Sequence, residues 1–166
     1  MGKTRLQPAH VETLMSYVPA LIAQRLANNP APTVTPFSER FPAAVLFADI
    51  SGFTALTERL AQKGPVGAET LTRSLNAYFG QMIDLITAYG GDVAKFAGDG
   101  LTAVWPVENE VGLPAVTLRA AACALAIQAA LRDYQADDEA RLTLRMGVSA
   151  GEVALIHITK SGGIWP

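Results

Sequence analysis

The sequence has little charge and almost no cysteine. Charged residues make up 17% of the 166 residues, and the formal net charge is −2 at pH 7. Proteins that bind nucleic acid usually carry a basic patch or stripe, so this charge balance gives no support for a nucleic-acid partner. Cys123 is the one cysteine, which excludes a disulfide framework or a cysteine-rich zinc site within the chain. We therefore expect a reducing compartment and a cytoplasmic protein.

Targeting and membrane signals are also scarce. The N-terminus lacks a basic start followed by an apolar stretch and a small-residue cleavage site. The most apolar helical run, residues 120–131, lies between Arg119 and Arg132 and contains Gln128. A run of this length is too short to cross a bilayer. The expectation is a chain with no secretory signal and no membrane span.

Hydrophobic residues are abundant, at 50% of the chain, which favours one domain with a substantial core over disorder. Apolar residues recur at helical spacing over residues 11–27, and Pro19 interrupts them. Prolines at 30, 32, 36 and 42 then indicate a linker. We predict a helical arm and linker over residues 1–36 and one domain over residues 37–166. The arm is expected to cover part of the core; a membrane-surface helix is the alternative, with only Arg25 as its basic face.

The hydrophobic pattern of the domain predicts the element order β α α β β α β β. Residues 43–50, 92–97, 101–105, 142–150 and 153–158 are strand-like, and residues 53–61, 67–89 and 115–134 are helical. This order corresponds to the split βαβ, ferredoxin-like arrangement of α+β proteins. The first strand and the hairpin should lie centrally in such a sheet. Because the first strand is almost continuously apolar, burial on both of its faces is expected.

Two aspartates lie at the ends of predicted strands. Asp49 ends the apolar run 43–48, and Asp99 lies at the tip of the hairpin 92–105. A carboxylate at the end of a buried strand is costly unless a cation or several donors compensate it. The ferredoxin-like arrangement would bring both acids to one edge of the sheet. We predict that they hold Mg²⁺ for a nucleoside triphosphate, since Mg²⁺ commonly takes one or two carboxylates plus phosphate oxygens.

The residues after Asp49 fit the same chemistry. The backbone carbonyl of Ile50 is a candidate for a further metal oxygen ligand. The turn formed by Gly52, Phe53 and Thr54 opens a helix, so its free N–H groups predict an anion site suited to a triphosphate.

Simpler interpretations stay open for each of these residues. Asp49 or Ser51 could be only the N-cap of the following helix. The Gly-Asp-Gly sequence around Asp99 could be only a hairpin turn. Lys95 could be a solvated charge on an edge strand, although its place four residues before Asp99 makes it a candidate substrate contact.

Three segments together resemble a known family. FADISGFTALTERL, GGDVAKFAGDGLTAVW and LRMGVSAGEV occur in this order and are similar to stretches of class III nucleotidyl cyclase catalytic domains. The likeness is greatest to the first of the two tandem domains of the soluble, bicarbonate-responsive adenylyl cyclases, and it covers about residues 41–157. It implies a cyclase fold that converts ATP to cyclic AMP and pyrophosphate between two catalytic domains, with two Mg²⁺ or Mn²⁺ ions, in intracellular signalling.

The resemblance also assigns roles to single residues. Metal binding falls to Asp49, Asp99 and the carbonyl of Ile50, and triphosphate contacts fall to Gly52, Phe53 and Thr54. Lys95 lies where the family has a lysine. In homodimeric members this lysine reads the purine of the partner's substrate, whereas in the tandem soluble type it belongs to a second pocket that binds bicarbonate.

The family's remaining active-site residues, a second base-reading residue and a catalytic Asn and Arg, are expected beyond Pro166. The chain is therefore interpreted as a C-terminally truncated cyclase domain. It would supply the metal half of an adenylate cyclase site, inactive alone, to a second cyclase domain in a homodimer or a tandem heterodimer. The alternatives are a non-catalytic regulatory module paired with another cyclase domain, a guanylyl cyclase, or a diguanylate cyclase, which the sequence Gly90-Gly91-Asp92 superficially suggests.

Overall fold

The computed structural model describes residues 18–29, 35–108, 111–132, 134–135 and 141–157. The chain divides into two compact units, one formed by residues 1–40 and 154–166 and the other by residues 41–153. Each unit is described by itself. The predicted boundary between residues 36 and 37 stays a prediction.

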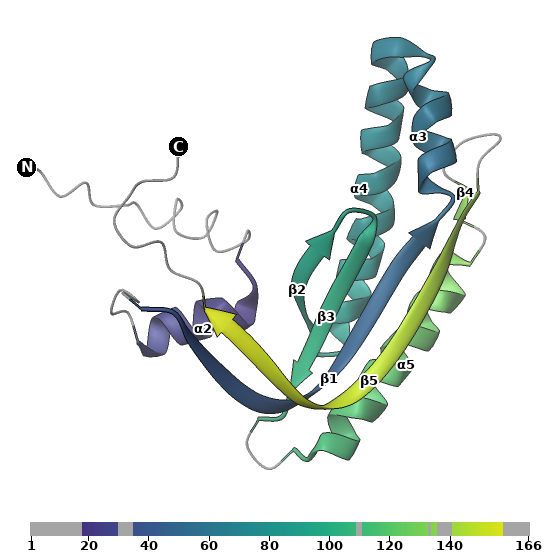
Figure 1. The fold of residues 1–166 in the computed structure, drawn as a ribbon. Coiled ribbons are helices and arrows are strands. Elements are labelled where there is room, and N and C mark those ends of the chain that lie inside the picture. Colours follow the sequence, from purple (N-terminus) through teal and green to yellow (C-terminus); the bar gives the residue numbers. More distant parts are fainter. Residues whose placement is uncertain (1–17, 30–34, 109–110, 133, 136–140, 158–166) are drawn as a thin grey trace, which may run out of the picture. The chain divides into compact units, whose positions relative to one another are not determined.

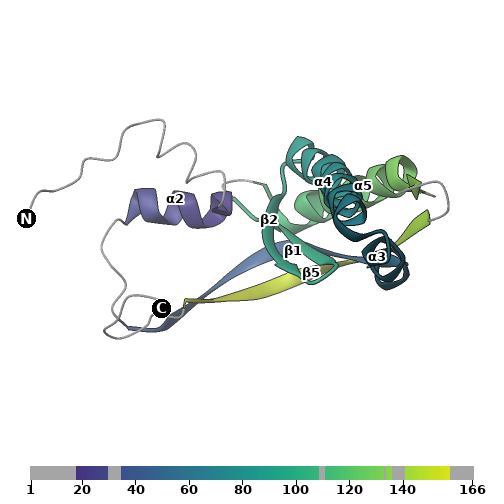
Figure 2. The same cartoon turned by 90° about the horizontal axis from the view of Figure 1, so that it is seen from above.

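The larger unit is built on an antiparallel sheet with helices packed on one face (Figures 1 and 2). The strands are β1 (Phe37–Ser51), β2 (Asp92–Ala97), β3 (Gly100–Pro106), β4 (Tyr134–Gln135) and β5 (Arg141–His157). The helices are α3 (Phe53–Ala61), α4 (Gly64–Ala88) and α5 (Leu113–Leu131). The strand order β2-β3-β1-β5-β4 confirms the predicted split βαβ, α+β fold. Both hairpin strands were expected to lie centrally, but β2 is an edge strand of the sheet.

One face of the central strand β1 is buried from Ala44 to Ile50, whereas the other is fully buried only at Ala43. Ala44, Leu46, Ala48 and Ile50 lie in the hydrophobic core. On the opposite face Phe47 is 49% exposed, because side chains alternate along a strand and the helices cover one face only. The prediction that both faces are buried is therefore wrong for the chain as described.

The end of α4 is closed by two glycines and a tryptophan. Gly90 has a φ of 74°, and the N–H of Gly91 donates to the carbonyl of Ile86 at 2.9 Å, which satisfies the end of the helix. The indole N–H of Trp105 donates to the carbonyl of Tyr89 at 3.0 Å. A Cβ on Gly91 would lie only 2.4 Å from the Trp105 ring, so this position requires glycine. Gly90 and Gly91 thus end a helix and do not form a hairpin tip.

Two helices begin earlier than the sequence predicts. Pro65 and Pro114 each lie in the first turn of their helix, α4 and α5, where a missing N–H costs nothing. The prolines therefore start these helices and do not break the chain before them.

The helix α5 has 19 residues and is long and apolar enough, by length and composition, to cross a membrane, whereas the length argument considered residues 120–131 alone. The length argument against a span is therefore wrong. One stripe of α5 is nevertheless buried in the core of the larger unit, at Val116, Ala120, Cys123, Ile127 and Leu131. The expected absence of a membrane span stays a prediction.

Other differences concern strand ends. β1 begins at Phe37 and runs through Pro42, whose carbonyl accepts from the N–H of Val107 at 2.9 Å. The two strands expected over residues 142–158 are one strand, β5, because Gly151 does not interrupt the extended backbone. Along β5, Val148 was expected to face the core, but it is 38% exposed.

In the smaller unit, Pro19 precedes the helix α2 (Ala20–Asn28), as predicted for the part of the arm after the proline. The first part of the arm and most of the linker lie outside the described residues.

Candidate functional site

Strand pairing brings the two predicted metal-binding aspartates to adjacent positions. Asp49, near the end of β1, is the register partner of Gly100 in β3. The N–H of Ile50 donates to the carbonyl of Asp99 at 3.3 Å, across the gap between β1 and the hairpin turn. Gly98, with a φ of 64°, allows this tight turn. Both acids are partly exposed, so water or a ligand can reach them.

The N-terminus of α3 follows directly after these acids. Gly52 is the N-cap residue, with a φ of 95°, and its carbonyl accepts from the N–H of Leu56 at 3.1 Å. A Cβ at this position would lie 3.1 Å from the carbonyl oxygen of Arg141. Glycine is needed here for two reasons, namely the left-handed backbone and the close approach of β5.

No side chain caps α3. The interpretation of Asp49 or Ser51 as its N-cap is therefore wrong, and both carboxylates of the pair remain open to another role. The N–H groups of the first turn, beginning at Phe53 and Thr54, have no partner within the helix, because no helical turn precedes them. They give this end of the helix a partial positive charge.

The site thus combines two acidic residues, which could hold a cation, with backbone donors, which could hold an anion. Among the described residues no group of three or more His, Cys, Asp or Glu side chains could hold a metal ion. Two carboxylates with a nearby backbone carbonyl suit Mg²⁺, which keeps several ligand positions for water and phosphate. These residues therefore fit a metal ion that arrives with a phosphorylated substrate.

Lys95 lies on the same face of the sheet as Asp49 but farther along it. The register pairs Phe47 with Thr102 and Thr102 with Lys95, which places these three side chains in one row across β1, β3 and β2. From ideal strand spacings, the Cα of Lys95 is about 12 Å from that of Asp49. Lys95 is exposed and does not belong to the compact group at the end of β1.

Phe47 lies on the same face of the sheet, and its exposure was not predicted from the sequence. It lies inside an apolar run, and a run of this kind gives no sign that one member faces solvent. Its ring tip reaches to 3.5 Å from the place of a Cβ on Gly100, beside the Asp99 turn. Alternation along the strand, counted from Asp49, was the signal that could have placed it on the face of the site.

Comparison with known sequences gives a family match. Residues 38–162 match the family described as "Adenylate and Guanylate cyclase catalytic domain". The rabbit (Oryctolagus cuniculus) protein "Adenylate cyclase type 10" is 30% identical over 156 residues, which cover 93% of this chain and 9% of that protein. The chain therefore spans less than a tenth of the length of this curated relative.

Solved structures give the same result for the fold. The adenylyl cyclase CyaB from P. aeruginosa is 28% identical with a TM-score of 0.60, over 71% of this chain and 60% of that one. The guanylyl cyclase Cya2 is 32% identical with a TM-score of 0.56, over 70% of this chain and 57% of that one. Structures of both nucleotide specificities thus share this fold.

Proposed function

The chain belongs to the family of adenylate and guanylate cyclase catalytic domains, and we propose that it supplies the metal-binding half of an adenylate cyclase site. That site would convert ATP to cyclic AMP and pyrophosphate for intracellular signalling, in the cytoplasm. A second cyclase domain, in a homodimer or a tandem heterodimer, would supply the other half.

One observation carries this proposal. The hydrogen bond from Ile50 to the Asp99 carbonyl holds the hairpin turn beside the end of β1, directly before the uncapped N-terminus of α3. Two carboxylates and a set of backbone donors therefore come together from two separate sequence motifs. This is the combination that a metal–triphosphate complex needs.

Each residue has a distinct part in the proposed reaction. The 3′-hydroxyl oxygen of ATP loses its proton to solvent and bonds to the α-phosphorus, the bond from that phosphorus to the oxygen bridging to the β-phosphate breaks, and pyrophosphate leaves. Asp49 and Asp99, with the Ile50 carbonyl, would hold two Mg²⁺ or Mn²⁺ ions. When bound, such ions activate the attacking hydroxyl and neutralise the leaving phosphates. The N–H groups of the turn at Gly52, Phe53 and Thr54 would bind and orient the triphosphate.

The uncovered sheet face supports a second domain. Catalytic domains of this family act on nucleotides as dimers. Phe47 lies on the uncovered face and is 49% exposed, which suits a surface that a protein partner covers. Lys95, about 12 Å from Asp49, would contact a substrate at a point away from the metal end.

ATP, and not GTP, is part of the proposal. It is supported by the similarity to adenylate cyclase type 10, while the structural neighbours include both adenylyl and guanylyl cyclases. Bicarbonate as a regulator is a further part of the proposal and would involve Lys95. A diguanylate cyclase is not proposed, since Gly90 and Gly91 close α4.

The test is a turnover assay with the 166-residue chain, alone and mixed with candidate second domains. ATP and GTP are supplied in parallel with Mg²⁺ or Mn²⁺, and the cyclic nucleotide and pyrophosphate are quantified. We expect cyclic AMP from the mixture and little from the chain alone. If the activity of the chain alone rises with the square of the chain's concentration, a second copy of the chain completes the site.

Robust turnover by the monomeric chain would contradict the half-site proposal. The regulatory alternative would gain if no second domain restores turnover while calorimetry still shows magnesium-dependent ATP binding. Absence of such binding in the paired domains would remove the metal role of Asp49 and Asp99.

A further inference from the structure

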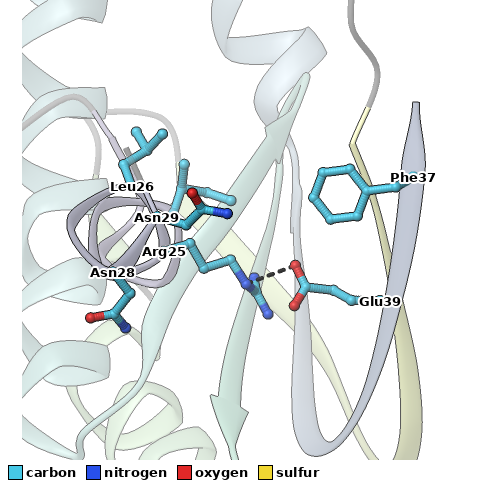
Figure 3. A pocket seen from close by; sticks show the side chains of 7 residues that line it. Arg25, Leu26, Asn28, Asn29, Phe37 and Glu39 are labelled. Carbon is cyan, nitrogen blue, oxygen red and sulfur yellow. Dashed lines mark ion pairs between the residues drawn. The ribbon is translucent and has the colours of Figure 1, made fainter. Parts of the chain in front are cut away.

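The helix α2 buries little apolar surface in the smaller unit. None of its nine residues is fully buried. A pocket of about 310 Å³ lies between α2 and the first residues of β1 (Figure 3). The apolar side chains of Ile22, Leu26 and Phe37 line this pocket, and Leu26 is 55% exposed. Because apolar packing holds α2 less firmly than it holds a core helix, the polar contacts of α2 contribute a larger share of the free energy that docks it.

Glu39, near the start of β1, contacts a cation and a histidine through one oxygen. The Nε of Arg25 on α2 lies 2.8 Å from the Oε1 of Glu39, and Figure 3 shows the Arg25 side chain extending from α2 to reach it. The Nε2 of His157, at the end of β5, lies 2.7 Å from the same oxygen. The two nitrogens can be no farther apart than the sum of these distances, about 5.5 Å. A single carboxylate therefore joins α2, β1 and β5.

The charge of this cluster depends on the protonation of His157. A carboxylate only accepts hydrogen bonds, so the neutral ring carries its proton on Nε2, and a second proton would bind at Nδ1. Ordinary histidines gain that proton between about pH 8 and pH 5, whereas carboxylates titrate near pH 4 and guanidinium groups above about pH 12. Protonation of His157 takes the cluster of Arg25, Glu39 and His157 from no net charge to one positive charge.

The ring of His157 is fixed on the strands. It stacks on the ring of Phe37, with centroids 4.1 Å apart and planes within 6°. The face of an aromatic ring attracts a cation within about 6 Å, so a protonated His157 is stabilised where it lies, between Phe37 and Glu39. Arg25 reaches Glu39 from a helix that is less firmly packed. Repulsion between the two cations therefore acts on the contact of α2 and not on the pairing of His157 with Glu39.

Other charged side chains nearby point away from this cluster. Arg40 directly follows Glu39 on β1, and Glu152 lies five residues before His157 on β5, so alternation places both on the opposite face of their strands. In the described part of the chain, the charged groups that lie against His157 are thus Glu39 and Arg25.

We propose that His157 is a pH-sensitive switch that controls how firmly α2 is held. With a neutral His157 ring, the carboxylate of Glu39 faces one cation, Arg25. With a protonated ring it faces two, and the repulsion between Arg25 and His157 opposes the docking of α2. Acidification therefore loosens α2. The coupling is reciprocal, so release of α2 favours protonation of His157. This proposal is independent of the cyclase function.

The experiment measures amide exchange of the 166-residue chain, without metal or nucleotide, on either side of the ordinary histidine pKa of about 6.5. Mass spectrometry follows exchange at about pH 8 and about pH 5.5, and each rate is divided by the intrinsic rate at that pH. We expect the protection of residues 20–28 to fall about fivefold at the lower pH, the size of a like-charge repulsion at this distance in a partly exposed site. The amides of β3 should keep their protection. Equal protection of α2 at both pH values would overturn the proposal.

The chain has two histidines, which provide a matched pair of variants. His157→Gln keeps a hydrogen-bond donor for Glu39 but cannot gain a charge, so the pH response of α2 should vanish. His10→Gln is the control and should keep the fivefold response. A response that persists in His157→Gln would overturn the proposal. Should His157→Gln unfold by circular dichroism, Arg25→Gln decides: without the guanidinium group there is no repulsion, and a pH response of α2 in that variant would overturn the proposal.

Discussion

The candidate metal and phosphate site and the pocket between α2 and the first residues of β1, in the smaller unit, are built by different means. Backbone geometry makes the first, through the turn at Gly98, the left-handed Gly52 and the hydrogen bond from Ile50 to the Asp99 carbonyl. Side chains make the second, since Glu39 contacts both Arg25 and His157, and His157 lies 118 residues after Glu39 in the sequence. A site of the first kind resists change at its glycines, whereas a site of the second kind depends on one carboxylate and on ionic conditions.

The largest expected effect is at the metal site. Asp99→Asn in the chain paired with a second domain should lower turnover by about 100-fold or more, because an amide is a poor Mg²⁺ ligand. The fold should persist, since asparagine is a good turn residue. Cyclic AMP production gives the first measure and thermal unfolding the second. An unfolded variant would instead support the interpretation of Asp99 as only a turn residue.

A methyl group at the backbone-built site should have the next largest effect. Gly52→Ala should lower the free energy of unfolding by about 1–2 kcal/mol, because its φ of 95° is left-handed and Arg141 is close. The matched control is Gly80→Ala in α4, where nothing lies within 4 Å of the added carbon. That control should gain about 0.5–1 kcal/mol. Chemical denaturation of both variants measures the difference, and equal values would contradict the backbone argument.

Removing the shared carboxylate should loosen the side-chain-built pocket. Glu39→Ala breaks the contacts to Arg25 and His157, and we expect amide exchange of residues 20–28 to rise about fivefold, the limit for partly exposed ion pairs. Glu69→Ala is the control, since the Glu69–Arg73 pair is exposed and lies within one helix. Exchange mass spectrometry follows both. If α2 exchanges at the same rate in both variants, the carboxylate does not hold α2.

The smallest effect should come from salt. Raising ionic strength from 0.1 to 1 M shortens the Debye length from about 10 to about 3 Å, which weakens partly exposed pairs such as Arg25–Glu39. Exchange of α2 amides should rise about twofold in the wild-type chain and not further in Glu39→Ala. The amides of β3, in the core of the larger unit, serve as the internal reference. A salt response that persists in Glu39→Ala would point to other charges.

Local patterns were sufficient for much of the fold and for the candidate site. The order of elements through α5 followed from hydrophobic periodicity, and Gly90-Gly91 and Gly98-Asp99 marked a helix end and a hairpin as expected, but the strand β4 was not predicted. Asp49 and Asp99 were identifiable because acids at the ends of apolar strands are unusual. The metal and substrate roles of these residues stay predictions, since geometry alone does not reveal a ligand.

Local patterns were insufficient where a residue's environment depends on distant packing. Pro65 and Pro114 each lie in the first turn of a helix, and the sequence around them did not distinguish a helix start from a break. Phe47 reads as buried, yet the described helices of its unit, α3, α4 and α5, pack on the other face of the sheet (Figures 1 and 2). The contact of His157 with Glu39 was not visible in the sequence, because the two residues lie 118 positions apart.

The sequence by itself determined the split βαβ order and the two glycine-bordered turns, because φ preferences and periodicity act between near neighbours. Only the tertiary structure decided that the turn at Gly98-Asp99 lies beside the turn at Gly52 that begins α3. It also decided that Arg25 and His157 both contact the Oε1 atom of Glu39. The physical reason is that strand register and side-chain ion pairs depend on which segments pack together, and that choice minimises the free energy of the whole chain.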